Sequence, residues 1–140
     1  MKITQLSVFA ENKPGQLIAP CRVLAEAGVN IRALSLADTQ RFGILRLIVN
    51  DSVEARQALE LAGFLVKSTE VVAIEVPDRP GGMAEILTVL EKSSVNIEYM
   101  YAFPFERGQN AVVIFRFDDP DAAIACLQKA GISLVAKQEL

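Results

Sequence analysis

Residues 13–31 read KPGQLIAPCRVLAEAGVNI, and residues 79–97 read RPGGMAEILTVLEKSSVNI. The Pro-Gly pair near the start and the Val-Asn-Ile triplet at the end recur at a constant separation of 66 positions, as Pro14 and Pro80 show. A fixed repeat on this scale indicates two copies of one small domain in a single chain. Residues that differ between the copies can therefore be compared at equivalent positions.

The second half of the repeat has a slightly larger separation. Asp51 matches Asp119 and Gly63 matches Gly131, so these positions lie 68 residues apart. The second copy must therefore hold two extra residues. Because loop tips tolerate insertions, we expect them in the turn at residues 106–109.

The copies set the expected domain boundaries. A chain of 140 residues has room for two small units, each with a thin core that gains from a partner surface. We expect one domain at residues 1–68 and a second at residues 69–140. Residues 67–70 would form a short linker.

Each copy has the pattern strand, helix, strand, strand, helix, strand. Leu6, Val8 and Ala10 alternate with Gln5, Ser7 and Phe9, the period of two that is typical of a strand. The second copy spaces its first-helix apolar residues at i, i+3, i+4 and i+7, and all four are expected to face the core: Met83, Ile86, Leu87 and Leu90.

This order predicts an α+β protein with two ferredoxin-like βαββαβ domains side by side. Their strands are expected to form a continuous eight-stranded antiparallel sheet with the helices on one face. The other face has no helix of its own and is a candidate surface for dimerisation or for docking on an enzyme. Alternation places these residues there: Gln5, Ser7, Phe9, Ile44, Arg46, Ile48, Ile114 and Arg116.

Pro20 interrupts the first helix of the first copy, where Ile86 stands in the second. An interior proline removes a helix hydrogen bond and clashes with the preceding turn, at a cost of about 3 kcal/mol. We therefore expect this helix to be kinked or to begin late.

Composition argues against several classes of function. The net charge is −3 and the basic residues are scattered, so no cluster matches a run of nucleic-acid phosphates. No apolar run reaches the roughly 18 residues of a membrane helix, and no leader peptide is evident, so we expect a cytoplasmic protein. Histidine is absent. No residue spacing suggests a metal site or a cofactor.

Two segments of each copy could bind a ligand: the loop before the first helix and the start of the second strand. Glycines at a helix N-terminus let a ligand approach backbone N–H groups, which favour a carboxylate. An asparagine side chain can donate and accept, whereas the Asp78 carboxylate only accepts. Read locally, the same residues could simply form turns. The candidates are Asn12, Pro14, Gly15, Gln16, Leu17, Asn30 and Ile31, with Asp78, Pro80, Gly81, Gly82, Met83, Asn96 and Ile97.

Over nearly the whole chain, these two motifs resemble the signature of ACT domains, regulatory modules that bind amino acids or other small ligands where paired domains meet. In a serine-binding domain of that family, the ligand is held by the loop asparagine of one domain and the strand asparagine of its partner. The resemblance thus implies one site from Asn12 with Asn96, and another from Asp78 with Asn30. Ala10 and Val76 stand where that domain has a histidine, which argues for a ligand other than serine.

The resemblance implies a non-catalytic regulatory protein that binds an amino acid or a similar ligand. Such a protein would act on a separate enzyme or transporter, and we expect a homodimer. An alternative is a structural or assembly subunit that needs no ligand. An enzyme is disfavoured, because no nucleophile and base recur at a useful spacing.

Overall fold

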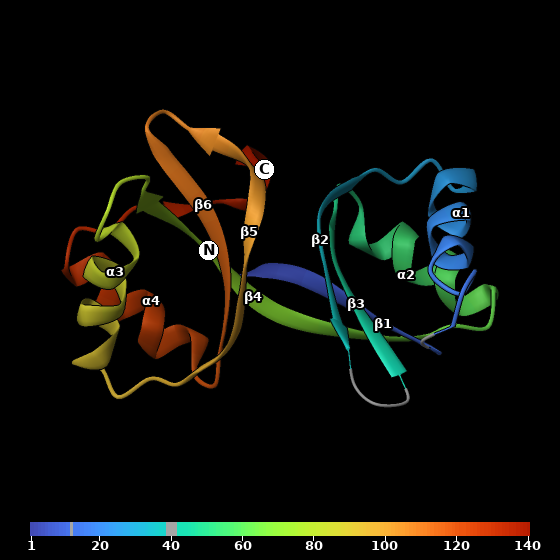
Figure 1. Cartoon of the computed structure of the whole chain (residues 1–140), viewed down its shortest axis with the longest axis horizontal. Coiled ribbons are helices and arrows are strands. Elements are labelled where there is room, and N and C mark those ends of the chain that lie inside the picture. Colours follow the sequence, from blue (N-terminus) through green and yellow to red (C-terminus); the bar gives the residue numbers. More distant parts are fainter. Residues whose placement is uncertain (12, 39–41) are drawn as a thin grey trace. The chain divides into compact units, whose positions relative to one another are not determined.

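The computed structural model describes residues 1–11, 13–38 and 42–140. The chain divides into two compact units, drawn in Figure 1. The first unit is Thr4–Thr69, and the second is Glu70–Leu140 together with Met1–Ile3. The N-terminal residues thus belong to the C-terminal unit, where the Lys2 ammonium group pairs with Glu70 and Asp121 at 3.2 Å each.

Both units have the βαββαβ order, and within each the two helices lie over the same face of the strands (Figure 1). The first unit contains β1 (Ile3–Glu11), α1 (Ile18–Glu26), β2 (Ile31–Asp38), β3 (Phe42–Val49), α2 (Ser52–Leu61) and the start of β4 (Leu65–Pro77). The second contains the rest of β4, α3 (Gly82–Glu91), β5 (Ile97–Arg107), β6 (Asn110–Phe117), α4 (Pro120–Lys129), β7 (Leu134–Val135) and the 3-10 turn η1 (Lys137–Glu139).

The strand order is the same in the two units. Hydrogen-bonded neighbours run β2-β3-β1-β4 in the first unit and, in the equivalent order, β5-β6-β4-β7 in the second. These orders confirm the α+β prediction and the two ferredoxin-like units. The last strand of the first unit and the first strand of the second are one element, β4, so seven strands fill the eight expected positions. The predicted linker at residues 67–70 was wrong, because these residues lie inside β4.

The helix-covered face of each unit holds its own core. Val72, Ile74 and Val76 of β4 face the core of the second unit, as their alternation predicts. Four residues predicted to lie on the opposite face are neighbours across the ladder between β1 and β3. Ser7 pairs with Arg46, and Phe9 pairs with Ile44. The first core is built from Leu6, Val8, Leu24, Val29, Leu45, Leu47, Val49, Ala55, Leu59 and Val66. The second has Val72, Ile74, Val76, Ile86, Leu90, Val113, Phe115, Phe117, Ala123, Leu127 and Leu134.

The first helix of the second copy buries less than its apolar spacing suggests. Ile86 and Leu90, one turn apart, are buried against the strands, and Met83 is partly buried. Leu87 is 36% exposed, contrary to prediction. It lies about 100° around the helix from Ile86, so it falls on the flank of a helix that presents a narrow stripe to the sheet.

The two extra residues of the second copy lie in a strand and not at the predicted turn. The register of β5 against β6 shifts between Ala102 and Glu106, whereas Arg107 and Asn110 close the hairpin as a regular pair. Pro104 stands within the shifted stretch. A proline cannot donate to a β-ladder, so a bulge is the place where a strand can hold it.

The late start predicted for the helix around Pro20 is confirmed. Helix α1 begins at Ile18, which makes Pro20 its third residue. In the first turn the missing N–H of a proline is not needed. Helix α3 begins at Gly82, the equivalent of Gln16, so the helix of the first copy begins two positions later.

Each copy turns into its second strand through a left-handed residue, but only one copy uses glycine there. Gly28 has φ +72°, and Ser94, 66 positions later, has φ +58°. A side chain in this conformation is strained because Cβ approaches the backbone carbonyl. Comparison of the copies therefore identifies backbone strain at Ser94 in the second copy, which glycine avoids at the equivalent Gly28.

We expect Ser94→Gly to raise the free energy of unfolding by roughly 0.5–1 kcal/mol, the left-handed penalty less the added freedom of the unfolded chain. Gly28→Ser should lower it by a similar amount. Urea denaturation followed by circular dichroism measures both. A Ser94→Gly protein less stable than the parent would contradict the strain assigned to Ser94.

Candidate functional site

The loop from Asp78 to Gly82 is a tight turn held by its own backbone. The Arg79 N–H donates to the Pro77 carbonyl at 3.0 Å, and the Gly82 N–H donates to the Arg79 carbonyl at 3.0 Å. The Asp78 N–H donates to the Gln109 carbonyl at 3.2 Å, which ties the loop to the β5–β6 hairpin. The exposed Asp78 and Pro80 are thus carried on a fixed backbone.

Two consecutive glycines in this loop have different reasons to be glycine. Gly81 precedes α3 with φ +86° and has open space around it. A Cβ on Gly82 would lie 1.9 Å from the Pro77 carbonyl oxygen, an impossible overlap. Gly82 therefore allows α3 to begin directly beside the end of β4.

The loop of the first copy is more open. Gly15 has φ +84°, the Gln16 N–H donates to the Lys13 carbonyl at 3.2 Å, and Leu17 is 42% exposed. The Lys13 ammonium group lies 2.9 Å from a Glu11 oxygen, and this hydrogen bond, with the Glu11 charge, raises the pKa of Lys13. The predicted ligand residue Asn12 lies outside the described residues.

The four long helices differ in how their N-termini are capped. Asp51 accepts from the Glu54 N–H at the start of α2, and Asp119 accepts from the Ala122 N–H at the start of α4, both at 3.1 Å. Helices α1 and α3, which follow the two candidate loops, have no side-chain cap at their N-cap residues. In α3 the Gly82 and Glu85 N–H groups donate to loop carbonyls. The intervening N–H groups point out of the helix end, where an anion is favoured.

The asparagines at the start of β2 and β5 are anchored through their main chains. The Asn30 N–H donates to the Asn50 side chain at 2.9 Å, and the Asn50 N–H donates back to the Asn30 carbonyl at 3.1 Å. Asn96 makes the same reciprocal pair with Asp118, at 2.9 and 3.1 Å. Both asparagines are exposed. Their backbones are thus fixed by bonds that do not use their own amide groups.

Three apolar residues predicted as ligand contacts also pack against the cores. Ile31 packs against the first core, and Ile97 and Met83 pack against the second. Each is only half-buried, so part of its side chain still reaches the surface.

Neither unit brings its own candidate loop close to its own candidate asparagine. In the second unit, β4 and β5 both pair antiparallel with β6, so they run in the same direction. The end of β4 and the start of β5 therefore lie at opposite ends of the sheet. Helix α3 between them has ten residues, a length of about 15 Å. The same argument applies to β1, β2 and α1 in the first unit. In each unit the candidate loop and the candidate asparagine therefore lie apart.

Sequence reasoning missed a pocket beside the second loop. This pocket of about 370 Å³ joins the Asp78 loop to the hairpin, and its walls are Pro77, Asp78, Arg79, Glu106, Gly108, Gln109 and Asn110. Its hairpin residues lie about 30 positions from the loop in sequence. The pairing of Pro77 with Asn110 brings them together, and only the strand register could have revealed it.

An ionic network stands beside this pocket. Arg107 pairs with Glu139 at 2.7 Å and with Glu75 at 2.9 Å, and the Asn110 amide donates to Glu75 at 3.0 Å. The hydrogen bond from Arg107, followed by that from the Ala136 N–H, lowers the pKa of Glu139. The hydrogen bond to Glu139 raises the pKa of Arg107. The network ties the C-terminal turn to the hairpin.

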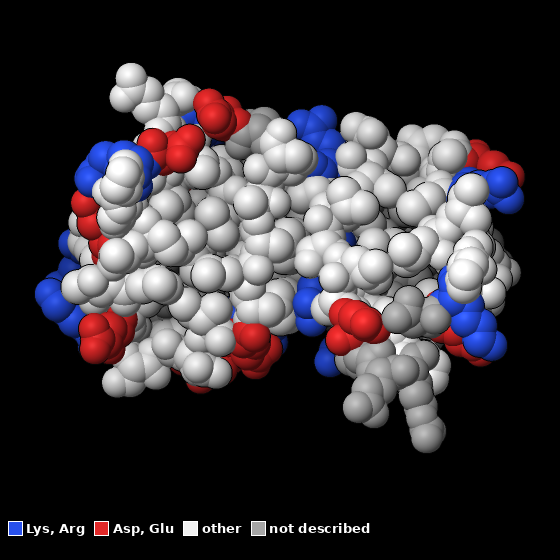
Figure 2. Space-filling model, in the orientation of Figure 1, with Lys and Arg blue, Asp and Glu red and all other residues white. Residues whose placement is uncertain are grey.

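Acidic and basic side chains pair at several exposed places, as Lys2 does with Asp121 and Arg56 with Glu60. On the face drawn in Figure 2, positive and negative side chains lie close to one another at several places. Across the described ranges, no cluster of His, Cys, Asp and Glu side chains could hold a metal ion. None of the helices in those ranges has the length and hydrophobicity of a membrane span.

Comparisons with known proteins agree with the repeat and the fold. A family model described as an ACT domain pair matches residues 1–140. Protein BT0572 from Bacteroides thetaiotaomicron is 40% identical, with a TM-score of 0.92, and the match covers 99% of this chain and 95% of that chain. No match was found among curated proteins.

Two regulatory subunits of aspartate kinase share the fold at lower identity. The subunit from Thermus flavus is 18% identical with a TM-score of 0.62, over 91% of this chain and 92% of that one. The ligand-free subunit from Thermus thermophilus is 19% identical with a TM-score of 0.62, over 91% of each chain.

We expect Gly82→Ala to lower the free energy of unfolding by roughly 3 kcal/mol, because the new methyl group overlaps the Pro77 carbonyl. Gly81→Ala is the matched control. It meets open space and should lose only about 1 kcal/mol from its left-handed backbone. Chemical denaturation of the two variants makes the comparison. Equal losses would show that loop strain, and not the contact with β4, fixes the glycine pair.

Proposed function

The chain belongs to the family of ACT domain pairs, and from this premise we propose that it is a non-catalytic regulatory protein that binds an amino acid. The ligand would bind where half-sites of two units meet, and the protein would act on a separate enzyme or transporter. The observation that carries the proposal is the contrast in helix capping. Of the four α-helices in the described ranges, the two that follow the candidate loops begin without an aspartate cap.

The uncapped helix end suits the carboxylate of an amino acid. An aspartate oxygen already accepts from the N–H of the third residue in α2 and in α4, whereas the N–H groups between Gly82 and Glu85 in α3 are left for a ligand. The aligned peptide dipoles add about half a positive charge at the same place. A ligand carboxylate could thus cap the N-terminus of α3, as the Asp119 side chain caps that of α4.

The asparagines suit the remaining polar groups of such a ligand. The amide of Asn30 or Asn96 can accept from an ammonium group and donate to a carboxylate. Asn50 and Asp118 fix the main chains that carry these amides, so a ligand would have to order only the side chains, which lowers the cost of binding.

The separation of loop and asparagine explains why the proposed site needs two units. Each unit offers an uncapped helix at one end of its sheet and an asparagine at the other. We propose that Asn12 acts with Asn96 and that Asp78 acts with Asn30. The partner unit could lie in the same chain or in a second copy of it. Ligand binding would then favour one arrangement of the units by its difference in affinity for the alternatives.

We expect at least one amino acid to bind saturably when all twenty are screened by thermal shift and then titrated by calorimetry. Asn96→Ala and Asn30→Ala should each weaken binding at one site by roughly tenfold, the loss of about one hydrogen bond to a charged group. Gln57→Ala removes an exposed helix amide and serves as the control. If no amino acid binds and the asparagine variants change only stability, the chain is a ligand-independent assembly subunit.

The two sites should also differ in affinity, because the Asp78 carboxylate would face a ligand carboxylate at only one of them. Asp78→Asn removes this repulsion and restores the residue type of the first loop. We expect calorimetry to show tighter binding at the weaker site in this variant and no change at the other. Unchanged affinity at both sites would place Asp78 outside the site.

A further inference from the structure

The second strand of the first copy has a symmetric sequence. Residues 32–38 read RALSLAD, and the five residues inside this stretch, ALSLA, are the same in both directions. Ser35 stands at the centre. The flanking residues, Arg32 and Asp38, lie three positions from Ser35 on either side and carry opposite charges. Such a strand is complementary to a second copy of itself in antiparallel pairing about a twofold axis.

This stretch lies in β2, an edge strand of the first unit. Among the described residues, β2 pairs with β3 from Ile31 to Asp38 and has no second neighbouring strand. An edge strand presents a row of backbone N–H and C=O groups on its open side. A further strand could therefore continue the sheet there by main-chain hydrogen bonds.

Two leucines of β2 are exposed although they lie on the helix-covered face. Leu34 pairs with Leu47, and Leu36 pairs with Leu45. Both partners belong to the first core, and residues directly opposite in a ladder share a face of the sheet. The Leu34 and Leu36 side chains are nevertheless 55% and 49% exposed. About half of each leucine thus remains for a neighbouring strand to cover.

The open side of β2 lacks the features that usually protect an edge strand. Such strands carry prolines, lysines or bulges that prevent a further strand from pairing. Residues 33–38 contain neither proline nor lysine. The one register shift of β2 against β3 lies at its beginning, between Ile31 and Ala33. From Ala33 onward the strand is regular and open to a partner.

The equivalent edge strand of the second unit is protected. Strand β5 contains Pro104, and its register against β6 shifts a second time between Ala102 and Glu106. Residues 98–104 read EYMYAFP, so the symmetric pairing would place Glu98 opposite a proline, which cannot donate to a ladder. The self-complementary sequence is therefore a property of the first copy alone, and the fold does not require it.

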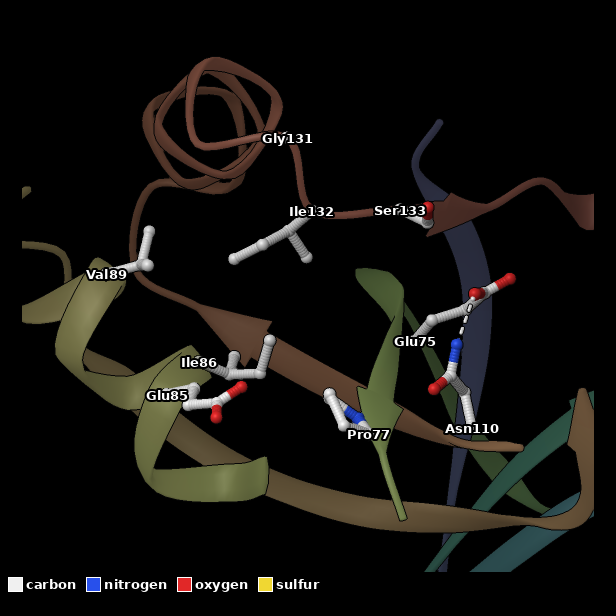
Figure 3. A pocket seen from close by; sticks show the side chains of 9 residues that line it. All are labelled: Glu75, Pro77, Glu85, Ile86, Val89, Asn110, Gly131, Ile132 and Ser133. Carbon is white, nitrogen blue, oxygen red and sulfur yellow. Dashed lines mark hydrogen bonds between the residues drawn. The ribbon is translucent and has the colours of Figure 1, made fainter. Parts of the chain in front are cut away.

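The edge of the second unit formed by β7 and β4 is also protected. Strand β7 pairs with Ala73 and Ile74, and β4 ends at Pro77, which has no N–H to donate. Beside this end, a cavity of about 330 Å³ lies between β4, α3 and the segment that follows α4 (Figure 3). An added strand would find no continuous ladder at this edge.

We propose that two copies of the chain pair edge to edge through β2, antiparallel and about a twofold axis at Ser35. In this register Leu34 of each copy lies opposite Leu36 of the other, on the same face of the sheet. The exposed halves of four leucines are thus buried against one another. Ala33 lies opposite Ala37, where two small side chains let the strands approach.

The charges select the same register as the leucines. Arg32 of each copy lies opposite Asp38 of the other, so two attractive pairs close the ends of the ladder. A slip of two residues would place Leu34 opposite Asp38. A slip of one residue would turn the helices of the two copies to opposite faces of the sheet. The partner that fits this edge is therefore a second copy in one register.

The test is sedimentation of the full chain over a range of concentrations, without added amino acid. The parent protein should sediment as a dimer. Leu34→Lys places an ammonium group at the apolar contact and should yield a folded monomer, as circular dichroism would verify. The matched control is Met100→Lys, since Met100 is the equivalent residue of β5 and is 44% exposed. This variant should remain dimeric.

A charge exchange tests the register itself. Arg32→Asp places two aspartates opposite each other at both ends, and Asp38→Arg does the same with arginines, so each variant alone should dimerise roughly tenfold more weakly. An equimolar mixture of the two variants restores both attractive pairs and should recover the parent affinity. A parent that is monomeric throughout, a dimer that survives Leu34→Lys, or a mixture no tighter than its components would overturn the proposal.

This interface goes beyond the proposed function and does not rest on it. It joins two first units through their strand edges and needs no ligand. Asn96→Ala, which lies in the second unit, should therefore weaken amino-acid binding and leave the dimer unchanged. A dimer that forms only when an amino acid is added would contradict the edge pairing and would leave the regulatory function intact.

Discussion

The structure depends on β4, a strand of thirteen residues that serves both units. Buried backbone groups must be hydrogen-bonded, and β4 lies next to β1 in the first unit and pairs with β6 from Val72 to Pro77 in the second. Its side chains also contribute to both cores, Val66 to the first and Ile74 to the second. A substitution in β4 that disrupts its pairing is therefore expected to disturb both units.

The duplication shows which features the fold needs and which it merely permits. Both copies place an aspartate cap before the second helix and a reciprocal backbone pair at the start of the second strand. In both copies the pairing register of the second strand shifts directly after its first residue, Ile31 or Ile97. They differ at the start of the first helix, where Gln16 and Pro20 delay α1 and Gly82 lets α3 begin at once. The shared features support the architecture, while the differing ones surround the candidate sites.

Much of the fold was predictable because its signals are local or repeated. Alternation in β1 and β4 placed the core residues correctly, and Pro20 predicted the late start of α1. The linker prediction failed because residues 67–70 are polar on both faces of a strand, a pattern that also suits a loop. The two extra residues were predicted in the wrong place, because a bulge at Pro104 and a longer turn change the repeat spacing by the same amount.

The candidate sites were less predictable. The loops and asparagines were found because they recur, but their separation within one unit follows from strand direction, which spacing alone does not give. The 330 Å³ cavity lined by Glu75, Glu85 and Ile132 left no repeated motif, since its polar residues are those in which the copies differ. Glu75 and Ser133 are 58 positions apart and meet only through the ladder between β4 and the segment before β7. Divergence between copies, read on the correct register, would have been the signal.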